Sequence, residues 1–222
     1  TKYEDVYGIF DELGMGRPQT KSMKKNPIVA QGQENVRKLL QSKYNGWLVN
    51  DVTTGFGVAV SADEGWKQIG GTPGASVVVQ GVGCVGLSCC PRVGIADANC
   101  FVYCESGLDV PSLIQNVKPR GEMDRDKFDP SWKVMPNTAW LDVPCDILVP
   151  VALEDVINEK NVDQVKAKLI CEGANIPVDQ KVDPILHQKG IWDIPDFIAN
   201  VGAVRFFYTV TFGVIEATPE AV

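Results

Sequence analysis

The sequence predicts an α/β protein in which a mostly parallel, doubly wound sheet follows a small, mainly helical N-terminal region. Two observations lead to this fold class. From residue 75 onward, short runs rich in valine or cysteine recur between glycines and prolines, as expected for strands buried on both faces. Helical patterns separate these runs, and strands that alternate with helices favour a parallel sheet with helices on both faces.

The composition excludes several classes of partner. The 222 residues are 45% hydrophobic and 22% charged, which is enough apolar material for a sizeable core. A net charge of −7 disfavours nucleic acid as a partner. No stretch approaches the roughly 18 apolar residues of a membrane helix, and residues 1–10 lack an apolar signal core, so we expect a cytoplasmic protein without membrane contact.

The seven cysteines do not predict a metal site. Zinc ligands usually come in short-spaced pairs of cysteine or histidine, and His187 is the only histidine in the sequence. A disulfide framework is not expected in a chain of this length. We interpret the cysteines as small buried hydrophobic residues and expect no bound metal.

The N-terminal region is expected to cover residues 1–52, ahead of a second domain over residues 53–222. Helices are predicted over residues 3–13 and 29–44, and Val36, Leu39 and Leu40 share one face of the second helix. Residues 47–52 are ambiguous.

Helices and strands then follow one another to the end of the chain. A helix is predicted over residues 57–69, because Val58, Ala62 and Trp66 are spaced for one buried stripe. We expect strands at residues 75–80, 100–104, 145–149, 167–171 and 190–194. We expect helices at residues 107–115, 153–159 and 184–189, with a last helix from residue 197, and few strong elements over residues 116–144.

The segment ASVVVQGVGCVG carries the most specific motif in the chain. It places Gly81, Gly83 and Gly86 in G-x-G-x-x-G spacing directly after a predicted strand. The first glycine permits a tight turn, the second lets the backbone approach a pyrophosphate, and the third lets the helix pack closely on the strand. The sequence therefore predicts a Rossmann-type domain that binds a dinucleotide.

An acidic residue is expected to end the second strand of such a domain, about 20 residues further along. Glu105 follows Gly86 by 19 residues and comes directly after the apolar run 100–104. A carboxylate in this position accepts hydrogen bonds from both ribose hydroxyls and repels the additional phosphate of NADP. The predicted cofactor is therefore NAD.

Four segments resemble one family. TTGFGV begins at residue 53, CDILVPVALEDVI at 145, AKLICEGANIPVD at 167 and GIWDIPDFIANVGAV at 190. These segments resemble, in the same order, parts of the NAD-binding domain of the glutamate, leucine, phenylalanine and valine dehydrogenases. The resemblance covers roughly residues 53–208. It implies the reversible oxidative deamination of an amino acid by hydride transfer to NAD, in a protein that forms homo-oligomers and acts on a small molecule.

The resemblance also implies which residues contact the cofactor. Asn175 and Asn200 each offer a donor and an acceptor, which suits ribose hydroxyls and a carboxamide. Ala152 follows a strand end, where ligands collect in open parallel sheets. The full set of expected cofactor-binding residues is Thr54, Gly81, Gly83, Cys84, Val85, Glu105, Ala152, Asn175 and Asn200.

The chain departs from the family pattern at several positions. Cys84 stands where the family usually has asparagine, Phe56 where arginine is common, and Phe207 where serine is frequent. Only about 50 residues precede Thr54, and none matches the family's catalytic lysine motif. The lysines at 21, 24 and 25 lack the buried surroundings that lower a lysine pKa, so the catalytic residues remain unassigned.

Two other functions stay open on the same predicted fold, because a fold does not determine a reaction. The short N-terminal region and Phe207 are compatible with an apolar pocket and a different NAD-dependent reaction. Alternatively, the chain is an NAD-binding domain without catalysis of its own, which regulates or requires a partner chain that carries the lysine.

Overall fold

The computed structural model describes residues 27–44, 47–88, 93–118 and 121–221. The helix expected at residues 3–13 and the lysines at 21, 24 and 25 lie outside these ranges. Contacts divide the chain into two compact units. One comprises residues 51–203, and the other joins the described part of residues 1–50 to residues 204–222. The last helix therefore groups mainly with the N-terminal region, whereas the sequence led us to place it with the second domain.

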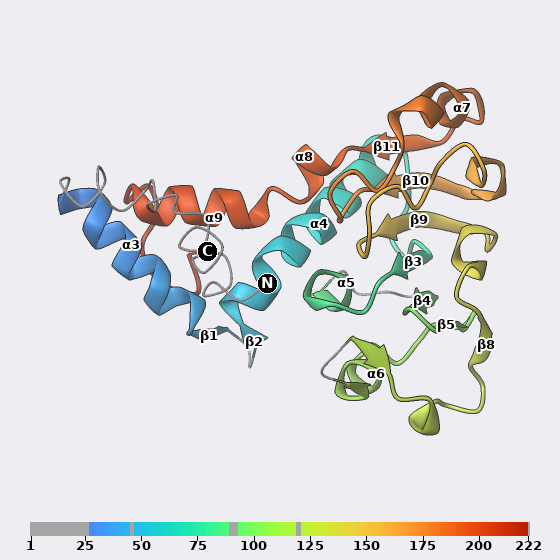
Figure 1. Ribbon diagram of the computed structural model, residues 1–222, viewed down its shortest axis with the longest axis horizontal. Helices are drawn as coiled ribbons and strands as arrows, with labels where there is room; N and C mark the ends of the chain where they lie inside the picture. The colour runs from blue at the N-terminus through green and yellow to red at the C-terminus, as the bar shows by residue number, and fades with distance from the viewer. Residues whose placement is uncertain (1–26, 45–46, 89–92, 119–120, 222) are drawn as a thin grey trace, which may run out of the picture. The chain divides into compact units, whose positions relative to one another are not determined.

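A seven-stranded sheet forms the centre of the larger unit (Figure 1). Its strand order is β11-β10-β9-β3-β4-β5-β8. The strands are β3 (Val77–Gln80), β4 (Gly94–Ala96), β5 (Cys100–Tyr103), β8 (Lys133–Pro136), β9 (Cys145–Pro150), β10 (Ala167–Cys171) and β11 (Trp192–Ile194). Neighbours from β11 to β4 are parallel, whereas β5 is antiparallel to β4 and β8 is antiparallel to β5. The predicted α/β class with a mostly parallel sheet is confirmed.

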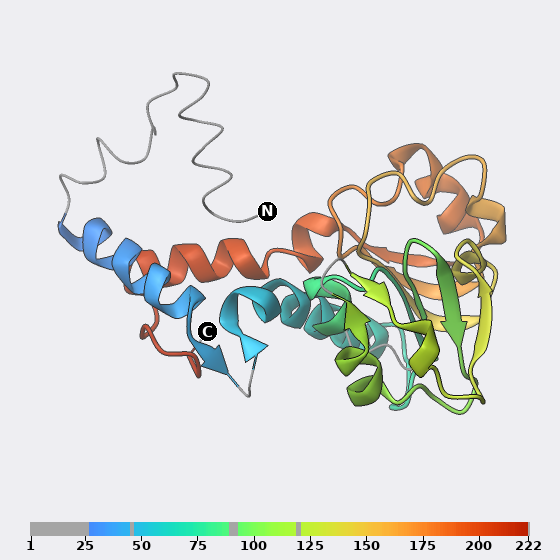
Figure 2. The same cartoon turned by 60° about the horizontal axis from the view of Figure 1, so that its bottom comes forward.

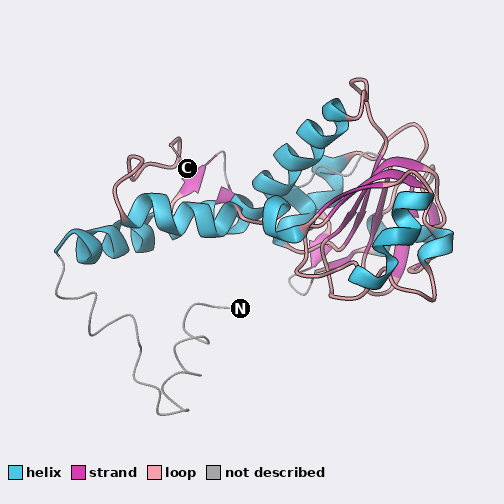
Figure 3. Cartoon of the chain, turned by 90° about the horizontal axis from the view of Figure 1, so that it is seen from above, coloured by secondary structure: helices cyan, strands magenta, loops and turns pink. Residues whose placement is uncertain are grey.

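Helices cover both faces of this sheet (Figure 3). On one face, α4 (Val49–Gln68) buries Val58, Ala62 and Trp66 as its spacing predicts, and α6 (Val110–Gln115) adds Leu113. On the other face, α7 (Asp183–Gln188) buries Leu186. The remaining elements of this unit are α5 (Cys84–Ser88), α8 (Asp196–Ala199), the hairpin β6–β7 (Val117–Lys118 and Glu122–Met123) and four 3₁₀ turns, η1 (Arg125–Lys127), η2 (Ala139–Leu141), η3 (Val162–Gln164) and η4 (Gln180–Val182).

The smaller unit is built on two helices that lie side by side (Figure 2). The helix α3 (Pro27–Leu40) buries Val36 and Leu39, and α9 (Gly202–Thr211) buries Phe206 and Val210 in the same cluster. Close approach requires glycine at position 32, because a Cβ there would collide with the backbone of Thr211. The short hairpin β1–β2 (Lys43–Tyr44 and Trp47–Leu48) precedes α4. No helix in the described ranges is long and apolar enough to span a membrane.

Two sequence predictions about local structure are wrong. No helix forms over residues 153–159: Asp155 has a φ of 51°, and Ile157 forms a parallel bridge with Val178. The Asn161 amide donates to Val156 O at 2.8 Å, which is the kind of side-chain bond that competes with a helix. The strand at 100–104 is present, but the second strand of the parallel sheet is the unpredicted β4.

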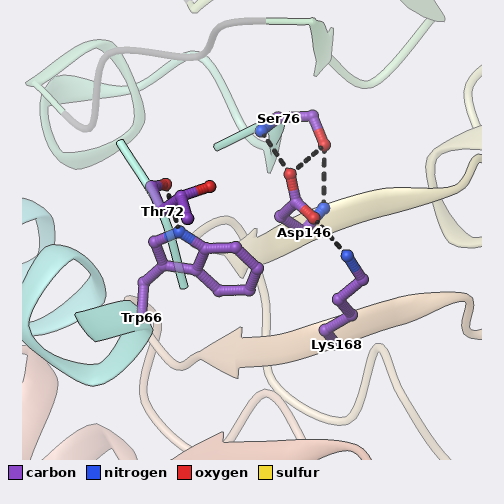
Figure 4. Close-up of polar contacts among 5 residues, drawn as sticks. All are labelled: Trp66, Thr72, Ser76, Asp146 and Lys168. Carbon is purple, nitrogen blue, oxygen red and sulfur yellow. Dashed lines mark hydrogen bonds and ion pairs between the residues drawn. The ribbon is translucent and has the colours of Figure 1, made fainter. Parts of the chain in front are cut away.

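A polar cluster at the amino ends of β3, β9 and β10 ties these strands together (Figure 4). The Asp146 carboxylate accepts hydrogen bonds from Ser76 N at 2.8 Å and Ser76 Oγ at 2.9 Å through one oxygen, and from Lys168 Nζ at 2.8 Å through the other. Lys168 Nζ also lies 5.5 Å from the centre of the Trp66 ring, which adds a cation–π contact with α4. Partial burial works to raise the pKa of Asp146, but the bonds from Lys168 and Ser76 hold it below its ordinary value.

We predict that Asp146→Ala lowers the free energy of unfolding by about 1–3 kcal/mol, because it leaves the Ser76 N–H without its acceptor. The control is Asp142→Ala. Asp142 also pairs with a lysine, Lys166 at 2.6 Å, but it is exposed, so we expect a loss of at most about 1 kcal/mol. Urea unfolding of both variants measures the difference, and equal losses would show that the cluster contributes no more than a surface ion pair. Because the pKa of Asp146 is lowered by folding, its contribution is present above about pH 4 and disappears as pH falls through the folded-state value.

Candidate functional site

The carboxyl ends of the parallel strands bring most of the predicted site residues to one edge of the sheet. In the register, Gln80 is paired with Ala96 of β4 and with Pro150 of β9, and β9 is in turn paired with β10. The turn after β3, the residues after β9 and the loop after β10 therefore emerge side by side. Ligands of open α/β sheets bind at this edge.

The glycine turn follows β3 directly, and its three glycines have different constraints. Gly81 has a φ of +121°, and a Cβ there would lie 3.0–3.2 Å from Val151 and Ala152. A Cβ at Gly86 would collide with the Gly81 carbonyl oxygen. At Gly83, in contrast, no atom of the described residues lies within 4 Å of the Cβ position, apart from Gly83 itself and its two chain neighbours. The fold thus requires the first and third glycines, and Gly83 borders open space.

Three further predicted residues lie around this edge. Ala152 packs against the glycine turn, and its N–H donates to Gln80 Oε1 at 3.2 Å. The Asn200 side chain donates to Asn175 Oδ1 at 2.8 Å and to Ala174 O at 3.2 Å. The structure therefore brings the two asparagines into direct contact, with Asn175 exposed and Asn200 half-buried.

Thr54 reaches the same region through α4. A Cβ at Gly202 would collide with Thr53 O and lie 3.3 Å from Thr54 Cα, so α4 passes in backbone contact with the segment that follows Asn200. Cys84 and Val85 form the first turn of α5, where Cys84 is exposed and Val85 half-buried. Four of the five cysteines within the described ranges are buried.

Glu105 does not belong to this site. It follows β5, which runs antiparallel to β4, and Cys104 N donates to Val93 O at the amino end of β4. Glu105 thus lies at the end of the sheet opposite the glycine turn. The prediction was wrong because a spacing of about 20 residues leads to the end of β5. The second strand of the parallel sheet is instead β4, which has only three residues.

Asp97 occupies the position predicted for the acidic residue. It directly follows β4, and Gly81 N donates to the preceding carbonyl, Ala96 O, at 2.8 Å. Its side chain is only 8% exposed and accepts 2.8 Å hydrogen bonds from the backbone N–H groups of Asn99, Cys100 and Met123. Asp97 thereby closes the turn that reverses the chain into β5. An acidic residue directly after the short apolar run 94–96 was the signal that sequence reasoning missed.

A second acidic group lies behind the asparagines. Glu172 is 6% exposed and accepts a hydrogen bond from Asp196 N at 3.0 Å through Oε2. Burial, and then the negative charge of the nearby Asp193 carboxyl group, raise the pKa of Glu172 to about 8. Burial raises the pKa of Asp193 as well. Neither residue was singled out from the sequence, because they are 21 positions apart and only the β10–β11 pairing brings them together.

No group of three or more histidine, cysteine, aspartate or glutamate side chains in the described parts of the chain could hold a metal ion. The arrangement instead combines an accessible glycine backbone, an acid at the adjoining strand end and paired amides. Together with the sheet, these features define an α/β protein of the Rossmann type.

The particular family follows from comparison with known proteins. The family model for Glutamate/Leucine/Phenylalanine/Valine dehydrogenase matches residues 46–209, and the chain belongs to this family.

Curated relatives are glutamate dehydrogenases, and their names specify different cofactors. The chain is 39% identical over 172 residues to the NADP-specific glutamate dehydrogenase of Saccharolobus shibatae, covering 73% of this chain and 40% of the relative. It is 31% identical over 180 residues to the NAD-specific glutamate dehydrogenase of Clostridioides difficile, covering 75% and 42%. The chain thus spans about two fifths of the length of these relatives.

Solved structures agree with the fold. Glutamate dehydrogenase from Peptoniphilus asaccharolyticus matches with a TM-score of 0.58 at 30% identity, covering 72% of this chain and 38% of that chain. The hetero-hexameric glutamate dehydrogenase from Thermus thermophilus matches with a TM-score of 0.67 at 24% identity, covering 80% and 43%. The second likeness concerns the fold alone.

The raised pKa of Glu172 predicts how stability varies with pH. The unfolded chain releases this proton near pH 4.3, whereas the folded chain keeps it until about pH 8. Between these values the folded state binds more protons, so the free energy of unfolding falls as pH rises, by at most about 1.4 kcal/mol per pH unit for this group. Urea unfolding from about pH 5 to about pH 8 measures the slope, and Glu172→Gln should reduce it. An unchanged slope in the variant would contradict the assignment.

Proposed function

We propose that this chain is the dinucleotide-binding part of an NAD-dependent amino-acid dehydrogenase, in which hydride passes between a substrate carbon and nicotinamide. Family membership supports the reaction class. The chain corresponds to about two fifths of its relatives, so the activity of the whole protein is part of the proposal. The proposal extends to a homo-oligomeric, cytoplasmic protein that acts on a small molecule.

The observation that carries the proposal is the open space at Gly83. Neither a positive φ nor a neighbouring atom explains a glycine at this position. A dinucleotide does explain it, because its pyrophosphate must approach the backbone at the second glycine of the turn. Cys84 and Val85, which come next, would provide the neighbouring backbone N–H groups.

The paired amides of Asn175 and Asn200 fit the nicotinamide end of the cofactor. Asn200 Nδ2 donates to Asn175 Oδ1, which fixes the orientation of both groups. Asn175 remains exposed and offers its amide nitrogen as a donor for a ribose hydroxyl or a carboxamide. Ala152 and Thr54 complete the proposed contacts. When bound, the cofactor accepts or supplies the hydride, and these residues orient it.

Asp97 replaces Glu105 as the basis for proposing NAD. Its carboxylate at the end of β4 would lie beside the adenosine ribose and repel a 2′-phosphate. NADP is the second candidate cofactor, because Lys118 and Arg125 line an adjoining hollow of about 410 Å³, which is also lined by three acidic residues, Glu122, Asp124 and Asp126. Comparing the affinities for NAD and NADP directly distinguishes the two cofactors.

The catalytic group remains unassigned within the described residues. Every lysine there is exposed, which does not provide the desolvation that lowers a lysine pKa. This observation favours, as a second candidate function, a chain that binds the cofactor and obtains its acid–base group from elsewhere. A different NAD-dependent reaction on an apolar substrate is the third candidate.

We predict that Gly83→Val weakens NAD binding at least about tenfold and changes the melting temperature little, because the new side chain meets only the cofactor. Gly81→Ala should instead lower the melting temperature, since it combines a positive φ with crowding by Val151 and Ala152. Glu105→Gln, at the opposite end of the sheet, should leave NAD affinity unchanged. Calorimetric titration and thermal unfolding measure these effects, and unchanged NAD affinity in Gly83→Val would overturn the proposed site.

We also predict how fast the purified chain oxidises amino acids. The purified 222-residue chain should bind NAD and oxidise glutamate, leucine, phenylalanine and valine very poorly, because no acid–base group is assigned among the described residues and the lack of one costs roughly 10²–10⁴ in rate. Absorbance of the reduced cofactor measures activity with these amino acids and with a panel of alcohols. Rapid turnover of one amino acid would show that the chain supplies its own lysine. Activity with alcohols alone would favour the third candidate function.

A further inference from the structure

Two carboxyl groups meet on one face of the sheet, next to the proposed nicotinamide site. Asp193 of β11 is paired with Ile170 of β10, and Glu172 lies two positions beyond Ile170 and therefore on the same face. The two side chains lie close enough to interact directly, and the negative charge of Asp193 disfavours ionisation of Glu172. A hydrogen bond between two carboxyl groups requires a proton on one of them. Asp193 Oδ1 is buried and has no hydrogen-bond partner among the described residues.

This carboxyl pair is connected to the loop that follows β10. Glu172 Oε2 accepts the backbone N–H of Asp196 at 3.0 Å. The Asp196 carboxylate in turn accepts Ile176 N at 2.9 Å through Oδ2 and Phe197 N at 2.7 Å through Oδ1. Ile176 has a φ of 49°, a conformation that a β-branched residue adopts only when its surroundings impose it. Asp196 therefore holds the backbone directly beside Asn175.

The same residues also fix the second asparagine. Asn200 N donates to Asp196 O at 2.8 Å, so α8 carries Asn200 at a set distance from Asp196. The Asn200 side chain then bonds to Ala174 O and Asn175 Oδ1. A continuous chain of hydrogen bonds thus runs from Glu172 through Asp196 to both asparagines.

The charges around the pair are almost all negative. A cavity of about 890 Å³ adjoins it, and the other titratable groups that line this cavity are Asp155, Asp179, Asp183, His187 and Asp196. Within the described ranges, no lysine or arginine lines it. Ionisation of both Glu172 and Asp193 would add a second negative charge in contact with the first, beside Asp196, without a cation to compensate it.

We propose that Glu172 and Asp193 are positioning residues that share one proton and thereby hold Asp196, Asn175 and Asn200 in the arrangement that receives the nicotinamide end of the cofactor. This inference rests on the proposed function. Loss of the shared proton leaves two adjacent carboxylates that repel each other. This repulsion acts at Glu172, where the series of hydrogen bonds to Asn175 and Asn200 begins. Cofactor binding and the shared proton are therefore linked, and NAD binds more weakly when the proton is lost.

The test is the pH dependence of NAD affinity, measured by calorimetric titration from about pH 6 to about pH 9.5. In the unaltered chain, we expect the Kd for NAD to rise about tenfold above pH 8, which corresponds to a linkage of about one pKa unit. Glu172→Gln keeps an acceptor for Asp196 N and a donor for Asp193 at every pH, so its affinity should stay high and flat. Asp193→Asn should remove the rise as well, and Glu172→Ala should bind weakly throughout.

Asp155→Asn is the matched control. It removes one negative charge from the same cavity, and asparagine tolerates the positive φ at this position, so this variant should follow the unaltered chain. A flat profile in the unaltered chain, or an unchanged rise in Glu172→Gln, would overturn the positioning role. If Glu172→Ala fails to fold, the Glu172→Gln and Asp193→Asn profiles still decide. A folded, unaltered chain that binds no NAD at any pH would instead overturn the proposed function itself.

Discussion

The parallel alignment of β3, β9 and β10 is the constraint on which the candidate site depends. The register of these strands decides which side chains follow one another along the carboxyl edge of the sheet, and a slip of one residue would reverse the face of every side chain in a strand. The Asp146 cluster fixes that register at the amino edge, with hydrogen bonds from Ser76 and Lys168. The two ends of the same strands therefore have separate tasks. The amino edge holds the strands in place, and the carboxyl edge is left to loops and glycines.

The parts of the fold predicted from the sequence are those with a strong local pattern. Burial of β3, β9 and β10 is visible in runs of consecutive apolar residues, and burial of α4 is visible in the regular spacing of its apolar residues. β4 has only three residues, which is too short for any periodicity, and the run at 100–103 has the stronger strand pattern. The direction of β5 depends on the turn closed by Asp97, and that turn is completed by Met123, 26 positions away.

The candidate site also combines residues that the sequence identifies with contacts that only the folded chain creates. The glycines belong to a motif with fixed spacing, and the asparagines came from resemblance, so both could be named before the structure. The contact between Asn175 and Asn200, and the carboxyl pair behind it, arise from the pairing of β10 with β11 and from the loops that follow. A pair of acidic residues that meet across two strands leaves no periodic pattern in a sequence. It is found only when the strands are aligned.

The three glycines of the turn are maintained by different forces. The backbone angle at Gly81 and the packing at Gly86 are properties of the protein alone, whether or not anything binds. Gly83 is not restricted by any contact that a Cβ there would make with the described residues. In a descendant of this chain that no longer used a dinucleotide, selection for folding would still retain the outer two glycines, while mutation could replace the middle one freely. The residue at position 83 would then indicate whether a lineage still binds a dinucleotide, even where the fold had not changed.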